Sequence, residues 1–211
     1  RTLQRIRDIE PDVIIASDDN AQRYLVVPHL MEQGPPIVFC GVNWDASGYG
    51  YPTERITGML EVESVRELHQ LLRRGADGPR IGYISGPTTT DEKIIDIFND
   101  RFFDGAMTVY TAADFQEFKE KYVQAQGEVD LLFLRNYAGI QGWEPEKAKA
   151  FLLENTRVPT GSHNDFMADY VIYTMGKYPQ EQGEFAARAA LDILAGASPA
   201  DIPVAKNRRV R

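Results

Sequence analysis

Residues 80–93 read RIGYISGPTTTDEK, and this stretch holds one complete structural unit. Its first half, residues 80–85, is almost continuously apolar, which is typical of a parallel strand buried on both faces. A Gly-Pro turn follows. Thr89 and Glu92 then have the spacing of a capping box, in which a hydroxyl and a carboxylate bond free amides at the start of a helix. The stretch predicts a buried strand, a turn and a helix that begins at Thr89.

The same succession recurs along the chain. Amphipathic helices are predicted after residue 111, over residues 146–154 with Pro145 in the first turn, and over residues 180–195. Strands that alternate with helices indicate an α/β fold with doubly wound parallel sheets. The other short apolar runs that predict buried strands are residues 12–16, 37–40, 107–110, 129–134 and 158–161.

The strands fall into two groups, which predicts two α/β lobes joined by a hinge. The first lobe is expected to hold residues 1–60 together with 174–211, and the second lobe residues 61–173. The chain then crosses between lobes more than once, because the last long helix returns to the first group. Two lobes with several crossings are typical of a clam-like binding protein.

Composition narrows the function. The 211 residues carry a net charge of −8, and an acidic surface repels nucleic acid and anionic lipid. One cysteine, Cys40, allows no internal disulfide and is expected to be a small buried hydrophobe. No apolar run reaches the roughly 18 residues of a membrane span. The chain begins with Arg1, and we expect it to be a piece of a longer protein.

Ligands of open α/β sheets bind outside the carboxyl ends of the strands. The turns at these ends are rich in short hydrogen-bonding side chains, and three of them add a large aromatic residue. This mixture suits a small polar or zwitterionic molecule with an apolar part. Helix capping is the alternative role of the Asx and Thr residues in these turns. The five turns are residues 17–20, 41–45, 85–90, 135–138 and 161–166.

Several chemistries lack their motifs. The three histidines are far apart and show no metal-ligand spacing, and no G-x-S-x-G, P-loop or G-x-G-x-x-G motif occurs, so no metal and no cofactor are expected. An α/β hydrolase-like enzyme stays open as an alternative, with His163 as base and Asp165 as its orienting carboxylate. That enzyme also needs a nucleophile, for which the sequence offers no motif.

The chain resembles the substrate-binding proteins of ABC transporters that adopt the periplasmic-binding-protein type I fold. The sequences SDDNA and FCGVNWD are most similar to those of family members that serve as extracytoplasmic sensor modules of signalling proteins. Family members begin with a strand and a helix before the stretch that corresponds to residues 11–21, and we expect the first lobe of this chain to lack them. The stretches that carry the resemblance are PDVIIASDDNA (11–21), PIVFCGVNWDAS (36–47), RITGMLEVES (55–64), RIGYISGPTTTDEK (80–93), VPTGSHNDFMADY (158–170) and EQGEFAARAALDILAGASPADIPV (181–204).

The resemblance implies non-catalytic binding of a small, amino acid-like solute in a cleft between the lobes, without a cofactor. It also implies a periplasmic or extracytoplasmic location and membrane transporter subunits as partners. For a sensor, the partner is a signalling module. The solute contacts implied by position are Ser17, Asp18, Asn20, Asn43, Trp44, Ser85, Thr88, Thr89, Asn136, Tyr137, Asn164 and Asp165.

The charges of the turns indicate the type of solute. Carboxylates at Asp18, Asp45 and Asp165 face a single basic residue, Arg135. We therefore expect a solute with an amine and at most one carboxylate, which Arg135 or the amides at the start of the helix after residue 88 would bind. Trp44 and the tyrosine at 137 would cover an apolar or planar group, so the first choice is an amino acid with a hydrophobic or aromatic side chain.

Overall fold

The computed structural model describes residues 1–211, which form two compact units. Unit 1 contains Arg1–Val62 and Lys177–Arg209, and unit 2 contains Glu63–Gly176 and Val210–Arg211. The chain therefore passes between the units three times. The boundaries expected from the sequence lie a few residues earlier, and the last two residues belong to unit 2 rather than to the first lobe.

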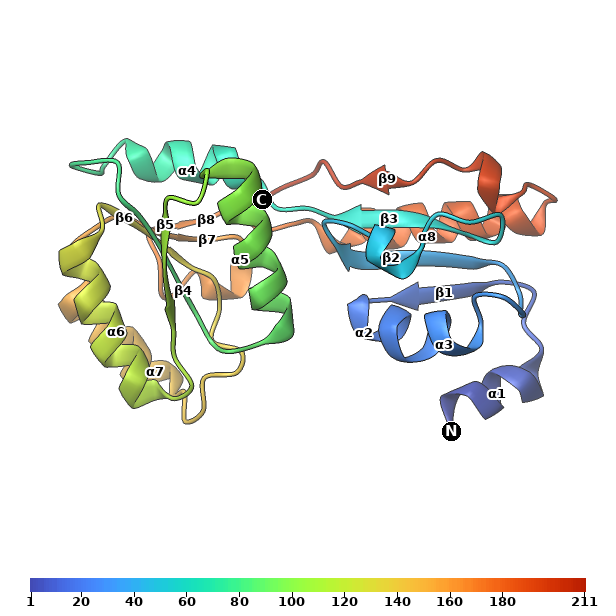
Figure 1. The fold of residues 1–211 in the computed structure, drawn as a ribbon, viewed down its shortest axis with the longest axis horizontal. Coiled ribbons are helices and arrows are strands. Elements are labelled where there is room, and N and C mark those ends of the chain that lie inside the picture. The colour runs from blue at the N-terminus through green and yellow to red at the C-terminus, as the bar shows by residue number, and fades with distance from the viewer. The chain divides into compact units, whose positions relative to one another are not determined.

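Unit 1 is built on a four-stranded parallel sheet with the order β1-β2-β3-β9. Its last strand comes from the returning C-terminal segment, which makes unit 1 discontinuous in sequence (Figure 1). Its strands are β1 (Ile14–Ser17), β2 (Ile37–Asn43), β3 (Ile56–Glu61) and β9 (Ala205–Lys206), and its helices are α1 (Thr2–Ile9), α2 (Asp19–Ala21), α3 (Val27–His29) and α8 (Pro179–Leu194).

Alternate residues of β2 serve the two faces of the unit 1 sheet. Val38 and Cys40 pack against the alanines of α8 on one face. Phe39 faces the other side of the sheet. There it packs with Val26 and Leu30, which belong to the helical segment that contains α2 and α3. Cys40 is buried and free of disulfides, as predicted, and burial raises the pKa of its thiol.

Unit 2 is a five-stranded parallel sheet with the order β5-β4-β6-β7-β8. From β4 the chain moves first to β5 on one side and then to β6 on the other, so the strand order reverses between β4 and β6. Its strands are β4 (Ile81–Ser85), β5 (Met107–Thr111), β6 (Leu131–Leu134), β7 (Thr160–Ser162) and β8 (Tyr173–Thr174), and its helices are α4 (Val65–Arg73), α5 (Thr89–Phe102), α6 (Phe115–Glu128) and α7 (Pro145–Asn155).

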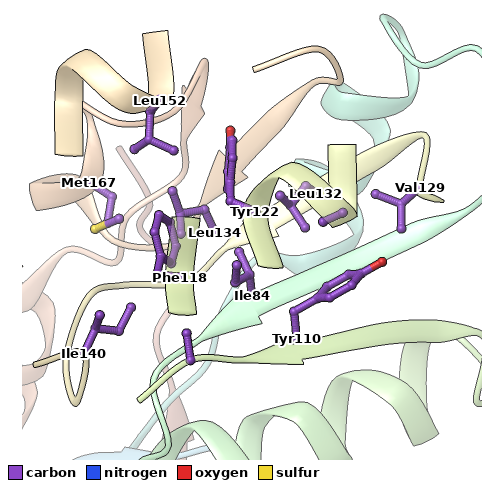
Figure 2. Packing of buried hydrophobic residues seen from close by; sticks show 12 residues of the cluster. Ile84, Tyr110, Phe118, Tyr122, Val129, Leu132, Leu134, Ile140, Leu152 and Met167 are labelled. Carbon is purple, nitrogen blue, oxygen red and sulfur yellow. The ribbon is translucent and has the colours of Figure 1, made fainter. Parts of the chain in front are cut away.

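The core of unit 2 lies on both faces of this sheet. Figure 2 shows the face covered by α6 and α7, where Ile84 and Leu134 of the sheet meet Phe118 and Tyr122 of α6. On the opposite face, the ring of Tyr83 meets that of Phe98 of α5 edge-on at 6.0 Å. Strands buried on both faces explain why their sequences are continuously apolar.

The α/β fold with two parallel sheets agrees with the sequence prediction. Helix α5 begins at Thr89 as predicted, but its capping residue is Thr88 rather than Thr89. Thr88 has an extended backbone, and its hydroxyl accepts a hydrogen bond from the backbone N–H of Asp91 at 3.1 Å. The sequence TTTDE satisfies the capping pattern in two registers, and the fold selects the earlier one. No helix of the protein has the length and apolar character needed to cross a membrane.

Candidate functional site

The carboxyl ends of parallel strands share one edge of a sheet, so each unit has one edge on which its strand-end loops gather. In unit 1 these loops follow β1 and β2, and in unit 2 they follow β4, β6 and β7. The contact residues predicted from the sequence lie in these loops, at the last residue of their strands or, for Asn20 and Thr89, in the first turn of the helix that follows.

The loop after β1 is held in a strained conformation. Asp18 has φ 78° and ψ 154°, a region that residues with a side chain rarely adopt. Its N–H bonds the carbonyl of Cys40 at 2.9 Å, and its own carbonyl accepts a hydrogen bond from the buried side chain of Gln22 at 3.1 Å. The side chains of Ser17, Asp18 and Asn20 remain exposed. The loop therefore presents three polar side chains on a fixed backbone.

Asp19 ties this loop to the end of β2. Its carboxylate accepts hydrogen bonds from the backbone N–H of Asn43 at 3.1 Å and from the side-chain amide of the same residue at 2.8 Å. The other carboxylate oxygen accepts the hydroxyl of Tyr49 at 2.6 Å. Burial, followed by the contact with Asp19, raises the pKa of Tyr49 far above its ordinary value. Asn43 is thus buried and engaged within the protein.

Trp44 differs from its predicted environment, a polar loop that leaves the ring open. The residue is only 8% exposed, and its backbone N–H donates to the carbonyl of Glu61 at 2.9 Å. The backbone has φ 59°, which is the left-handed region. Trp44 and Asp18 are therefore two strained residues at the ends of neighbouring strands.

Three buried ionisable residues lie at the edge of unit 2. The Nη2 of Arg135, in the loop after β6, is 3.5 Å from Oε1 of Glu63, and its Nε is 3.4 Å from Oδ1 of Asp91. The guanidinium is 5% exposed. The structure corrects the expectation that Arg135 awaits a solute carboxylate, because two carboxylates of the protein already surround it.

Asp91 lies in the first turn of α5 and connects this group to two predicted contact residues. It accepts hydrogen bonds from the hydroxyl of Thr88 at 2.6 Å and from the side chain of Asn136 at 3.4 Å. Burial raises the pKa of Asp91, although the Thr88 hydroxyl and Arg135 both favour its ionised form. Thr89, the first residue of α5, is exposed, whereas Ser85 at the end of β4 is fully buried.

The loop after β7 is bonded to the loop after β6. The main-chain carbonyl of Arg135 accepts hydrogen bonds from Ser162 Oγ at 2.8 Å and from the Asn164 side chain at 2.9 Å. Asp165 forms an ion pair with Arg211 and lies against Gly176. Asn164 and Asp165 thus stabilise the loops of this edge, and both side chains stay partly exposed.

An aromatic cluster borders the loop after β6. Tyr137 stacks on Trp143 with ring centroids 5.3 Å apart, and it meets Phe166 and Tyr170 edge-on at 5.7 and 6.1 Å. Tyr137 and Phe166 are exposed. The cluster gives the edge of unit 2 an accessible apolar border beside its polar loops.

His163 lies inside the core rather than at a reactive surface. It is 1% exposed, its ring stacks on Phe133 at 5.6 Å, and it meets Phe98 edge-on at 5.3 Å. The carboxylate of Asp165 is engaged with Arg211. This environment does not favour the hydrolase alternative, because a general base has to reach its substrate.

The structure thus divides the predicted contacts into exposed and buried residues. Ser17, Asp18, Asn20, Thr89 and Tyr137 are exposed, while the others are partly or fully enclosed. The sequence predicts Asp19 only as one of the polar residues of the turn 17–20, and it assigns no contact to Glu63 or Asp91, because no local signal separates these two from other acidic residues. No group of three or more His, Cys, Asp or Glu side chains is placed to hold a metal ion.

Comparisons with known proteins identify the fold. No family model and no curated protein matches the chain. Among solved structures, similar chains are the substrate binding protein CD0873 of Clostridium difficile in its ligand-free, open form (17% identity, TM-score 0.72) and the ABC domain from Streptococcus pneumonia in complex with L-Trp (13%, 0.70). A conserved domain protein of Vibrio cholerae O1 biovar El Tor is also similar (15%, 0.69). Each comparison covers 99% of this chain and 72 or 73% of the other. The chain therefore shares the α/β fold of substrate-binding proteins.

Proposed function

We propose that this protein binds a small organic solute without changing it chemically, and that the two strand-end edges supply the contacts. The observation that carries the proposal is the strained backbone at Asp18 and Trp44. Conformations of this kind cost on the order of 1–3 kcal/mol each and cluster where function requires them. Both occur at the end of a strand of unit 1, where an open sheet binds its ligand.

The side chains of the edges favour a particular class of solute. The exposed carboxylate of Asp18 can receive an amine, and the free N–H groups at the start of α5, beside Thr89, can receive one carboxylate. The exposed ring of Tyr137, supported by Trp143, can cover a planar or apolar group. We therefore propose an amino acid with a hydrophobic or aromatic side chain. The neighbour that holds L-Trp supports this choice.

The cellular role follows from the same proposal. A solute shared by both edges favours the conformation in which both contact it, by as much as its affinity differs between conformations. We propose that this shift is read outside the cytoplasm by a membrane transporter of the ABC type. The neighbours described as a substrate binding protein and an ABC domain support this role. A signalling module that reads the same shift is the alternative from the sequence.

A thermal-shift screen tests the proposal. Amino acids, nucleosides, sugars and dicarboxylates are each added to the protein, and a ligand at 100 times its Kd adds about 2.7 kcal/mol of stability. We expect hydrophobic and aromatic amino acids to raise the melting temperature. Stabilisation by sugars or dicarboxylates with amino acids silent contradicts the proposed class.

Two aspartates on either side of β1 provide a matched pair of variants. Asp18→Ala at the carboxyl end is expected to abolish the thermal shift, whereas Asp12→Ala before the strand leaves it unchanged. Both side chains are exposed, so neither variant removes a buried contact, and Asp18→Ala loses only the hydrogen bond that its carboxylate accepts from the backbone N–H of Asp19 at 2.6 Å. Equal shifts in the two variants would remove the carboxyl edge of unit 1 from the site.

A further inference from the structure

Three of the few buried charges of this protein lie together at the carboxyl end of β6. Glu63, Asp91 and Arg135 are each at most 5% exposed, and the guanidinium stands 3.5 and 3.4 Å from its two carboxylates. A charge removed from water is stable only when it is paired. The two carboxylates therefore dictate where Arg135 lies.

Glu63 is also the first residue of unit 2 after the chain leaves unit 1. The residues before it are anchored in unit 1. Glu61 pairs with Lys177 at 2.7 Å, and the N–H and carbonyl of Val62 bond the side chain of Asn207 at 2.6 and 3.1 Å. At the first crossing, Val62 is therefore held in unit 1 by Asn207, and the next residue, Glu63, is held in unit 2 by Arg135.

Arg135 passes this anchoring on to the strand-end loops of unit 2. Its backbone N–H donates to the carbonyl of Ile84 at 3.2 Å, next to the end of β4. Its carbonyl receives hydrogen bonds from Ser162 and Asn164, at the end of β7 and just beyond it. A shift of Arg135 therefore moves groups at the ends of three strands.

We propose that Glu63 is a positioning residue for the solute-binding edge of unit 2 and that it acts through Arg135. The pair sets the position of the loops after β6 and β7 from the first crossing segment. Solute bound at those loops and the conformation of the crossing are then coupled. The inference rests on the proposed function for its consequence in binding, and on the geometry alone for the positioning.

The test compares Glu63→Gln with Asp130→Asn. Asp130 forms an ion pair with Arg80 in the same unit, just before β6 and therefore at the opposite edge of the same sheet. Amide hydrogen exchange is followed by mass spectrometry in residues 162–166 and, for reference, in β5. Binding of L-tryptophan is measured by calorimetry.

We expect Glu63→Gln to accelerate exchange in residues 162–166 by about tenfold while β5 is unchanged. It should weaken binding of L-tryptophan by roughly tenfold. Asp130→Asn should do neither. Glu63→Asp keeps the charge and should accelerate exchange by a smaller factor, which a change that only unfolds the loop would not produce.

A double variant identifies the route of the effect. In an Arg135→Met background, Glu63→Gln should cause no further acceleration, because the residue that it positions is gone. The double variant also removes the charge of both members of the Glu63–Arg135 pair, which keeps the comparison possible if the single variant folds poorly. Acceleration of the same size with and without Arg135, acceleration confined to residues 61–66, or a uniform rise throughout the protein overturns the proposal. If the unchanged protein binds no amino acid, the proposed function fails, and the exchange data still decide the role of Glu63.

Discussion

The carboxylate of Asp19 accepts both the backbone N–H and the side-chain amide of Asn43, at 3.1 and 2.8 Å. The loop after β1 and the end of β2 therefore behave as one piece. This contact explains why Asn43, a predicted solute contact, is buried instead of free. Asp19 is therefore the residue that holds the loop after β1 against the end of β2.

Asp19→Ala should lower the free energy of unfolding by about 2–3 kcal/mol, because it leaves the buried amide of Asn43 without its acceptor. Urea denaturation followed by the fluorescence of Trp44 in a Trp143→Phe background measures the loss. Tyr49→Phe removes only one hydroxyl and should cost about 1 kcal/mol or less. Equal costs for the two variants would show that Asn43 does not depend on Asp19.

Asp18→Gly should raise the free energy of unfolding by about 1 kcal/mol, since glycine adopts φ 78° without the strain that Asp18 bears. The same variant should lose solute binding, because it removes the carboxylate. Asp104→Gly, at another positive φ that lies outside the strand ends, is the control. It should stabilise the protein with binding intact. An Asp18→Gly protein that binds as before would show that the strain serves no site.

Gly86→Ala should destabilise unit 2 and disturb its edge. A Cβ on Gly86 would lie 2.1 Å from the main-chain oxygen of Ala138, so the loops after β4 and β6 would have to separate. Gly127→Ala in α6 meets no atom within 4 Å and should stabilise the helix by roughly 0.5–1 kcal/mol. Melting temperatures of the two variants should therefore move in opposite directions. A rise for both would mean that the loops are free to part.

Acid should destabilise unit 2 through Asp130. The hydrogen bonds from Arg80 hold the pKa of Asp130 below its ordinary value, so its contribution is complete above that value and is lost as the pH falls through the lowered pKa. Asp130→Asn should therefore flatten the decline in stability below about pH 4. The reporter is Trp143 in a Trp44→Phe background. Asp91 acts in the opposite sense, because burial raises its pKa and protonation there relieves a buried charge.

His163→Ala should cost about 2 kcal/mol of stability, because a buried ring between Phe98 and Phe133 is lost. Solute binding should be unchanged. His163→Phe keeps a ring in this place and should recover part of the stability. A variant of normal stability that loses a hydrolytic activity would restore the enzyme alternative.

The sequence predicts elements well here because their signals are local. Apolar runs and caps placed β4 and α5 to within one residue at their starts, and the parallel fold followed from them. Side-chain orientation was harder. Asp18, Asp19 and Asn20 are alike in sequence, and only the backbone angle at Asp18 decides that Asp19 turns inward to Asn43.

Long-range pairing was not predictable. Arg135 was singled out as the one basic residue of the strand-end turns, which is correct as a count. Its partners Glu63 and Asp91 come from distant parts of the chain, and no spacing rule joins them to it. The sequence therefore places Arg135 at the strand-end edge of unit 2, but it does not show that Glu63 and Asp91 already pair with its guanidinium.

The interleaving of the two units affects how the chain folds during synthesis. Val38 and Cys40 of β2 must wait for α8, which the ribosome produces only after the whole of residues 63–176. At about 5–20 residues per second, this delay is on the order of 10 s. During that time unit 1 lacks the helix that packs on one face of its sheet, whereas unit 2 already has nearly all of its residues. Unit 2 can therefore complete its fold before unit 1 does. In the interval, the apolar face of the unit 1 sheet that α8 later covers is accessible to chaperones.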